Sequence, residues 1–256
     1  MTCSNEIRVY ERMYTKTVIV IESILLTLVL FLAAFDFFQP KFENMQLRNR
    51  YSAEDIESMQ NYKFDSTASG YVLSTLHSNF NGRIEIPKKF DGEKVVSIAD
   101  GAFKNFKDID EIVIPNSIER IGKSAFANCD SLKWITIPDS VTEIVKVDFT
   151  SKGAFEDCDS LEGVSVGEGI VALTYHMFAG CDSLKELHLK STLKEIRDYS
   201  FLECKKLETV YYEGTMEQWS NVHIQDYAFD NDVLFVVICE DGSVAYPSQD
   251  QQEELK

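Results

Sequence analysis

Hydrophobic residues return along this chain at a regular spacing from about residue 103 to residue 240. Apolar side chains follow six, nine and eleven residues after a phenylalanine, as Leu132, Ile135 and Ile137 follow Phe126. Self-similarity of this kind indicates stacked repeats, here about six units of ~23 residues. The phenylalanines that mark the units lie 23, 29, 23, 23 and 28 residues apart: Phe103, Phe126, Phe155, Phe178, Phe201 and Phe229.

Each unit also contains a short stretch that alternates with period two, which is typical of a β-strand. "EIVI" at 111–114 and "WITI" at 134–137 show the pattern, and Pro115 and Pro138 follow and end the strand. One unit alone buries too little apolar surface to offset the entropy of ordering its backbone. We therefore predict a mostly β solenoid with a shared core, in which the nine-residue count from Phe229 places Ile238 inward.

The positions between the inward residues form the outward side of the predicted strand ladder. If both isoleucines of "WITI" point inward, Trp134 and Thr136 point outward. Repeat proteins present such a row to their partners, and aromatic side chains often anchor interfaces, which favours Trp134, His188 and Tyr211. The alternative is that these are exposed strand residues without a partner. The predicted partner-binding residues are Glu111, Val113, Trp134, Thr136, Ser165, Glu186, His188 and Tyr211.

"AFANCDSLKWITIPDSVTEI", at 125–144, closely resembles the BspA-type leucine-rich repeat, and the resemblance covers roughly residues 82–240. The segment that begins "YKFDSTASGYVL" resembles the N-terminal capping unit of that family. "VYYEGTMEQWSNV" resembles its closing unit, where we expect Trp219 to cap the core. The resemblance implies a leucine-rich repeat solenoid at a bacterial cell surface that binds proteins or glycans. An insertion at 145–152 is either loop slack or a contact loop.

A different pattern precedes the repeats. "TVIVIESILLTLVLFLAAF", at 17–35, is apolar apart from Glu22 and is long enough to cross a bilayer as a helix. A cleaved signal peptide is the alternative, but the run is long for one and no A-x-A-type site follows it. We favour an uncleaved, single-pass signal anchor at 17–38. Lys and Arg are balanced on its two sides, so an extracellular solenoid is expected only because the large body follows the span.

These patterns divide the chain into six segments. We predict a cytoplasmic tail at 1–16, the transmembrane anchor at 17–38 and a linker at 39–61. The N-terminal capping unit then occupies 62–102, the repeats with their closing unit 103–244, and a polar tail 245–256.

The net charge of −17 is concentrated in the body. Residues 1–43 contain four Lys/Arg and five Asp/Glu, which leaves −16 for the remainder. Such a body repels phosphate backbones, so we predict no nucleic-acid partner.

Four cysteines recur at the repeat spacing: Cys129, Cys158, Cys181 and Cys204. They lack the C-x-x-C pairs of a zinc site. Stacking at strand spacing brings them within reach of disulfide geometry, so disulfides stay an alternative. The first unit has Phe106 at this position, however, and a residue that exchanges with phenylalanine is a packing residue. We therefore favour free structural thiols.

Catalytic chemistry finds little support in the motifs. "GVSVG", at 163–167, matches the G-x-S-x-G nucleophile elbow, but Ser165 falls on the repeat strand instead of a strand–helix turn. The histidines are dispersed and the acidic clusters lack calcium-loop spacing, so we predict no enzyme, metal or cofactor. We expect a non-catalytic, membrane-anchored protein that mediates protein or glycan binding or adhesion at the cell surface. The alternative is an intracellular, membrane-tethered scaffold or regulatory module.

Overall fold

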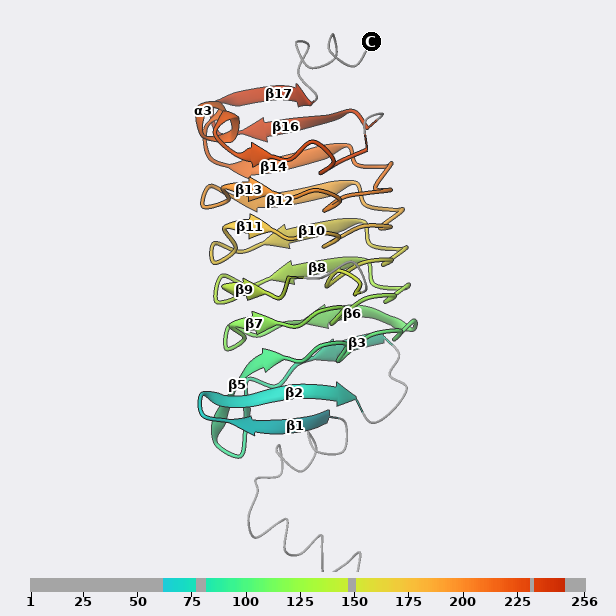
Figure 1. Ribbon diagram of the computed structural model, residues 1–256, viewed down its shortest axis with the longest axis vertical. Helices are drawn as coiled ribbons and strands as arrows, with labels where there is room; N and C mark the ends of the chain where they lie inside the picture. The colour runs from blue at the N-terminus through green and yellow to red at the C-terminus, as the bar shows by residue number, and fades with distance from the viewer. Residues whose placement is uncertain (1–61, 77–81, 147–150, 231–232, 247–256) are drawn as a thin grey trace, which may run out of the picture. The chain divides into compact units, whose positions relative to one another are not determined.

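A computed structural model describes residues 62–76, 82–146, 151–230 and 233–246, all of them within one compact unit, Glu57–Lys256. Within these residues the longer strands of successive turns form one eight-stranded sheet (Figure 1). Its strands, in spatial order, are β17 (Gly242–Tyr246), β16 (Phe235–Cys239), β14 (Thr209–Glu213), β12 (Glu186–Lys190), β10 (Gly163–Val166), β8 (Trp134–Ile137), β6 (Ile109–Val113) and β3 (Gly82–Glu85).

The remaining strands form two further sheets in the described residues. One contains β1 (Tyr62–Thr67), β2 (Gly70–Leu76), β5 (Glu93–Ile98), β7 (Arg120–Ile121) and β9 (Glu143–Ile144), with β4 (Lys89–Phe90) paired to β5. The other contains β11 (Ala172–Leu173), β13 (Glu195–Ile196) and β15 (His223–Ile224). A short helix, α3 (Met216–Ser220), lies between β14 and β15 along the chain.

Pairing between successive turns is parallel, as a solenoid requires. The two ends of the described stack differ from its middle. At one end β1 pairs with β2, and at the other β16 pairs with β17, each in an antiparallel hairpin. The predicted mostly β solenoid is therefore confirmed. It has seven parallel long strands, one more than the six predicted repeats, because β3 contributes a turn ahead of Phe103.

The predicted membrane anchor at 17–38 lies outside the described residues, as do the tail at 1–16 and the linker at 39–61. Among the residues that are described, no helix is long and apolar enough to span a bilayer.

The repeated phenylalanines form one column of rings through the core. Neighbouring ring centroids lie 4.9–5.5 Å apart and neighbouring planes are within 14° of parallel. Every ring is buried. This spacing follows from the distance of about 4.8 Å between hydrogen-bonded strands, which superposes the same position of each turn. The column contains Phe103, Phe126, Phe155, Phe178, Phe201 and Phe229.

A sharp backbone turn follows each of the first five phenylalanines. Two residues after the ring, φ is positive, between 58° and 73°, a region in which Asn, Asp and Gly are the most tolerated residues. The chain has such residues at four of the five positions. The five positions are Asn105, Asn128, Asp157, Gly180 and Glu203.

The last unit departs from the predicted register. Ile238 was expected to point inward, but it is 41% exposed, whereas Val237 is fully buried. Ile238 pairs with Tyr211 of β14, an outward residue, so the connection from Phe229 to β16 is one residue shorter than in the preceding units. The nine-residue count was therefore wrong for this unit, because the spacing of phenylalanines does not report the length of each connection.

Candidate binding face

The outward positions of the long strands form a continuous surface, which we call the strand face. Its first row follows the pairing of residues across β6, β8, β10, β12, β14 and β16: Glu111, Trp134, Gly163, Glu186, Thr209 and Val236. Its second row contains Val113, Thr136, Ser165, His188, Tyr211 and Ile238. All eight residues predicted from the sequence lie on this face, each exposed or half-buried.

Three of the predicted residues form an aromatic cluster: Trp134, His188 and Tyr211. The ring centroids of Trp134 and His188 lie 5.6 Å apart, and those of His188 and Tyr211 lie 4.6 Å apart with planes 20° from parallel. The cluster therefore extends from β8 to β14, across the intervening β10. Trp134 keeps 41% of its surface exposed, although an indole is among the most favourable side chains to bury.

Gly163 makes this arrangement possible. A Cβ added to Gly163 would lie 1.8 Å from Cζ3 of Trp134, so the indole lies directly across the glycine on the neighbouring strand. Gly163 is not among the residues predicted from the sequence to bind a partner. A glycine inside a strand is nevertheless a signal, since it often marks the close approach of another group.

Charged side chains flank the aromatic cluster unevenly. At the β3 side, Arg83 contacts Glu111 at 3.0 Å and Glu85 at 3.8 Å, and the three charges lie together. Near the cluster, the Glu186 carboxylate lies 3.7 Å from Nε2 of His188. That nitrogen is buried and has no hydrogen-bond partner among the described residues. Glu111 therefore borders Trp134 on the neighbouring strand, with its charge paired to Arg83.

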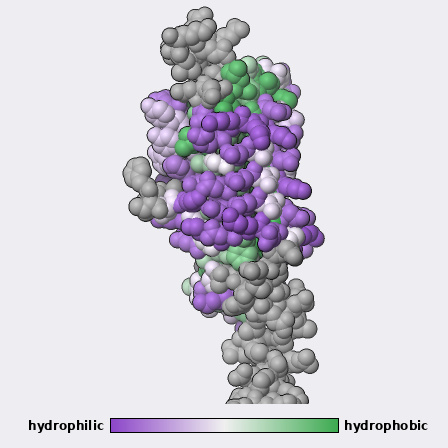
Figure 2. Space-filling view, turned by 90° about the vertical axis from the view of Figure 1, so that its right-hand side faces the viewer, coloured by the Kyte–Doolittle hydropathy of each residue, from purple (hydrophilic) through white to green (hydrophobic). Residues whose placement is uncertain are grey.

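The other end of the strand face is apolar. Val236 and Ile238 continue the two rows beyond Thr209 and Tyr211, and both are exposed. Leu234, directly before β16, is also exposed. Figure 2, which views another side of the body, shows hydrophobic residues gathered at this C-terminal end above largely hydrophilic repeats. The sequence analysis missed Val236 and Ile238 because the shorter connection shifts them outward.

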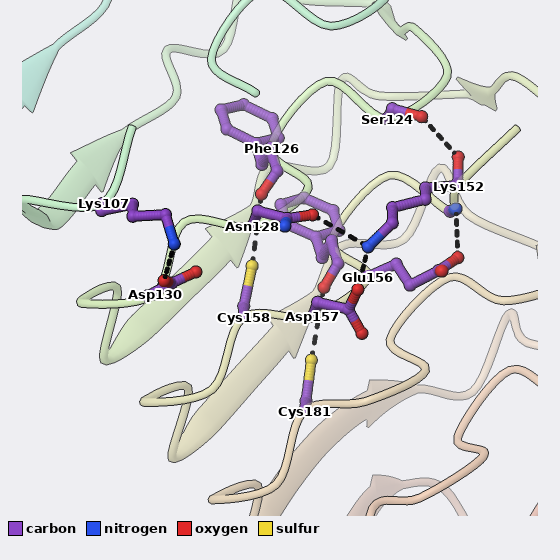
Figure 3. Close-up of polar contacts among 12 residues, drawn as sticks. Lys107, Ser124, Phe126, Asn128, Asp130, Lys152, Glu156, Asp157, Cys158 and Cys181 are labelled. Atoms are coloured by element: carbon purple, nitrogen blue, oxygen red, sulfur yellow. Dashed lines mark hydrogen bonds and ion pairs between the residues drawn. The ribbon is translucent and has the colours of Figure 1, made fainter. Parts of the chain in front are cut away.

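The cysteine column lies in the core and its members are free thiols. Each thiol donates to the carbonyl of a phenylalanine, for example from Cys158 to Phe126 at 3.2 Å and from Cys181 to Phe155 at 3.3 Å (Figure 3). Cys129 and Cys204 make the equivalent bonds to Phe103 and Phe178. Burial raises the pKa of Cys181. All four thiols are buried and hydrogen-bonded to backbone carbonyls, and buried thiols of this kind are unreactive, so this column is structural.

The turns beside this column have charges that are satisfied locally. Lys152 donates to Asn128 and pairs with Asp157, while Lys107 pairs with Asp130 at 2.8 Å (Figure 3). At Asp159, burial followed by the neighbouring carboxylates raises the pKa of the side chain. No group of three or more His, Cys, Asp or Glu side chains within the described ranges is placed to hold a metal ion.

Ser165 and Trp219 lie where the sequence placed them. Ser165 is in the middle of β10, paired in parallel register with Thr136 and His188, so the strained turn of a nucleophile elbow is missing. Trp219 is buried in α3, edge-on to Tyr212 with ring centroids 5.3 Å apart, and closes the core as predicted. Residues 147–150 of the insertion lie outside the described residues.

A stack of short parallel strands with an outward row that changes from turn to turn defines a leucine-rich repeat solenoid. The BspA type leucine rich repeat region matches residues 96–235 in six copies, and the chain belongs to this family. The expected resemblance is thereby confirmed. A search of curated proteins gave no significant match.

Solved structures of similar proteins agree with this assignment. A leucine-rich repeat protein of T. pallidum is 27% identical with a TM-score of 0.53, over 59% of this chain and 68% of that one. A leucine-rich cell surface protein of Faecalibacterium prausnitzii is 25% identical with a TM-score of 0.53, over 62% of this chain and 40% of that one. This chain thus matches less than half of the second protein's length.

Proposed function

We propose that this chain is a non-catalytic surface protein that binds a protein partner through its strand face, with the aromatic cluster at the centre of the contact. The observation that carries the proposal is the position of Trp134, which lies across Gly163 with much of its indole exposed. Aromatic residues held in place by packing lose little entropy on binding, and such residues dominate interface energetics.

The contrast between the interior and the face supports the same proposal. The buried phenylalanine recurs in six successive units, whereas the outward residues include Trp, Gly, Glu, Thr and Val in a single row. Stacking of the turns requires similar buried residues in each turn, but it does not require similar residues on the strand face. Two lysines of the turns, Lys107 and Lys152, are paired with neighbouring aspartates, whereas the aromatic cluster is an exposed apolar surface on a sheet.

Location is the second part of the proposal. We infer that residues 17–38 anchor the chain in a membrane with the solenoid outside the cell. The apolar run in the sequence supports this placement, as does the likeness to a leucine-rich cell surface protein. A solenoid on the cytoplasmic side would instead make the chain a membrane-tethered scaffold.

A binding screen tests the face. The full-length chain is presented to a panel of extracellular proteins and glycans, beside a variant with Trp134→Ala and Tyr211→Ala. We expect a protein ligand whose affinity falls at least tenfold in the variant, since hot-spot residues contribute about 2 kcal/mol or more. The thermal transition should change little because both rings are partly exposed.

Tyr227→Ala is the matched control, because this ring is 57% exposed but lies away from the strand face, stacked on Tyr199. Equal loss of binding in both variants would contradict the role of the aromatic cluster. A neutral glycan as the sole ligand would move the proposal from protein to carbohydrate recognition.

A labelling experiment tests the location. The cysteines of the described residues are buried, so Lys133→Cys, at an exposed position, supplies a reactive thiol. Labelling of intact cells by a membrane-impermeant maleimide, above the level of the unsubstituted chain, is expected for an external solenoid. Labelling only after lysis would contradict surface display and support the scaffold.

A further inference from the structure

The carboxylates of the long strands differ in their partners. Glu85 and Glu111 share Arg83, and Glu213 receives Lys190 at 2.7 Å. Glu186 is different: the cationic partner recorded for it among the described residues is His188, 3.7 Å away and charged only when protonated. Within the described part of the chain, the aromatic cluster is therefore flanked by a carboxylate that is not paired with a lysine or an arginine.

Glu186 and Trp134 lie on either side of the same residue of the strand ladder. Both residues pair with Gly163, one from each adjacent strand. Because Gly163 has no side chain, the indole of Trp134 extends across it toward the strand that holds Glu186 and contacts His188. An exposed aromatic ring and an exposed carboxylate thus border the same shallow position on the strand face.

We propose that this position binds the guanidinium or ammonium group of a basic segment in the protein partner. The cation would lie on the face of the Trp134 indole and pair with the Glu186 carboxylate. A cation is attracted to the face of an indole, and a carboxylate forms charge-assisted hydrogen bonds with it. Arginine fits best because its planar group can stack and donate at once.

The charge of the body favours the same class of partner. Between residues 62 and 246 the chain contains 18 Lys/Arg and 31 Asp/Glu, a net charge of 18 − 31 = −13. A field of this sign accelerates the approach of a basic segment and repels an anionic glycan. The inference rests on the proposed function and specifies the chemistry that the same face recognises.

A pair of synthetic peptides tests the inference with the full-length chain. One alternates arginine with glycine, and the other has citrulline in place of each arginine, which keeps the shape but removes the charge. Fluorescence anisotropy of the labelled peptides measures the affinity. We expect the arginine peptide to bind and the citrulline peptide to bind at least tenfold more weakly.

Two variants locate the contact. Glu186→Gln should weaken the arginine peptide about fivefold to tenfold, as expected for the loss of a charge-assisted bond. Glu119→Gln is the control, since it removes the same charge from an exposed residue directly before β7, outside the strand face. Equal weakening by both variants would show attraction to the net charge alone and would overturn the inference.

Gly163→Ala tests the geometry while both interacting groups remain. The new methyl would occupy the space of the indole, so Trp134 must move off the glycine. We expect binding to weaken about twofold to fivefold, the contribution of an exposed cation–π contact, together with a change in tryptophan fluorescence. Unchanged affinity with a displaced indole would also overturn the inference.

Failure here is distinguishable from failure of the proposed function. A partner whose binding depends on Trp134 and Tyr211 but not on Glu186 would support the strand face as the binding surface. It would contradict a basic segment as the ligand. If no partner depends on Trp134 and Tyr211, both proposals fail.

Discussion

The phenylalanine column and the strand face run along the same turns at the same spacing, yet one is uniform and the other changes at each step. Rings in the column lie nearly parallel because each turn superposes the same residue on the last. On the face, a glycine adjoins a tryptophan, and a histidine stacks on a tyrosine. Stacking therefore dictates the interior and leaves the face free to acquire a ligand.

A cavity in the phenylalanine column should have the largest effect on stability. Phe155→Ala removes a fully buried ring between Phe126 and Phe178, and we expect the free energy of unfolding to fall by about 3–5 kcal/mol. Urea unfolding measures the loss. Phe155→Leu, which keeps most of the volume, should cost clearly less. Equal stability of the alanine variant and the native chain would show that the column is not the core.

Two adjacent residues of β16 lie one on each side of the sheet. Val237 is fully buried and Ile238 is 41% exposed, so alanine at Val237 should cost about 2 kcal/mol and alanine at Ile238 less than about 1 kcal/mol. Thermal or urea unfolding of the two variants decides between the registers. The reverse order would support the nine-residue count that predicted an inward Ile238.

The buried thiols give the smallest effect, and it depends on pH. Burial keeps the pKa of Cys181 above its usual value, so in the folded state the thiol stays protonated while the unfolded chain ionises. This contribution to stability is complete below the usual thiol pKa of about 8.5 and is lost as pH rises above it. The expected slope approaches about 1.4 kcal/mol per pH unit for one thiol.

Urea unfolding between about pH 8 and pH 10 measures this slope. Cys181→Ala is the comparison chain and should lose stability less steeply over the same range. Tyr62, whose pKa is raised to about 12 by burial and by Glu85, adds a further loss only above the usual tyrosine pKa of about 10. Identical slopes for the two chains would contradict a contribution from Cys181.

Sequence reasoning succeeded where one rule repeats. The recurring phenylalanine, strand and cysteine predicted the solenoid and the outward positions of Trp134, His188 and Tyr211, because alternation in a strand assigns each residue to a side. The prediction for Ile238 was wrong, because a connection one residue shorter shifts the register of β16 and turns Ile238 outward. The contact of Trp134 with Gly163 also escaped sequence reasoning, since partners on neighbouring turns depend on register and on side-chain direction.

The two terminal hairpins have a consequence for how this chain avoids misfolding. Since the buried residues are nearly the same in every turn, the interior does not distinguish one turn from the next. A chain that skipped a turn would bring equivalent phenylalanines and cysteines together and would pack almost as well. The β1–β2 and β16–β17 hairpins occur once each, at opposite ends of the described stack. They supply the unique contacts by which the correct register is selected over its shifted copies.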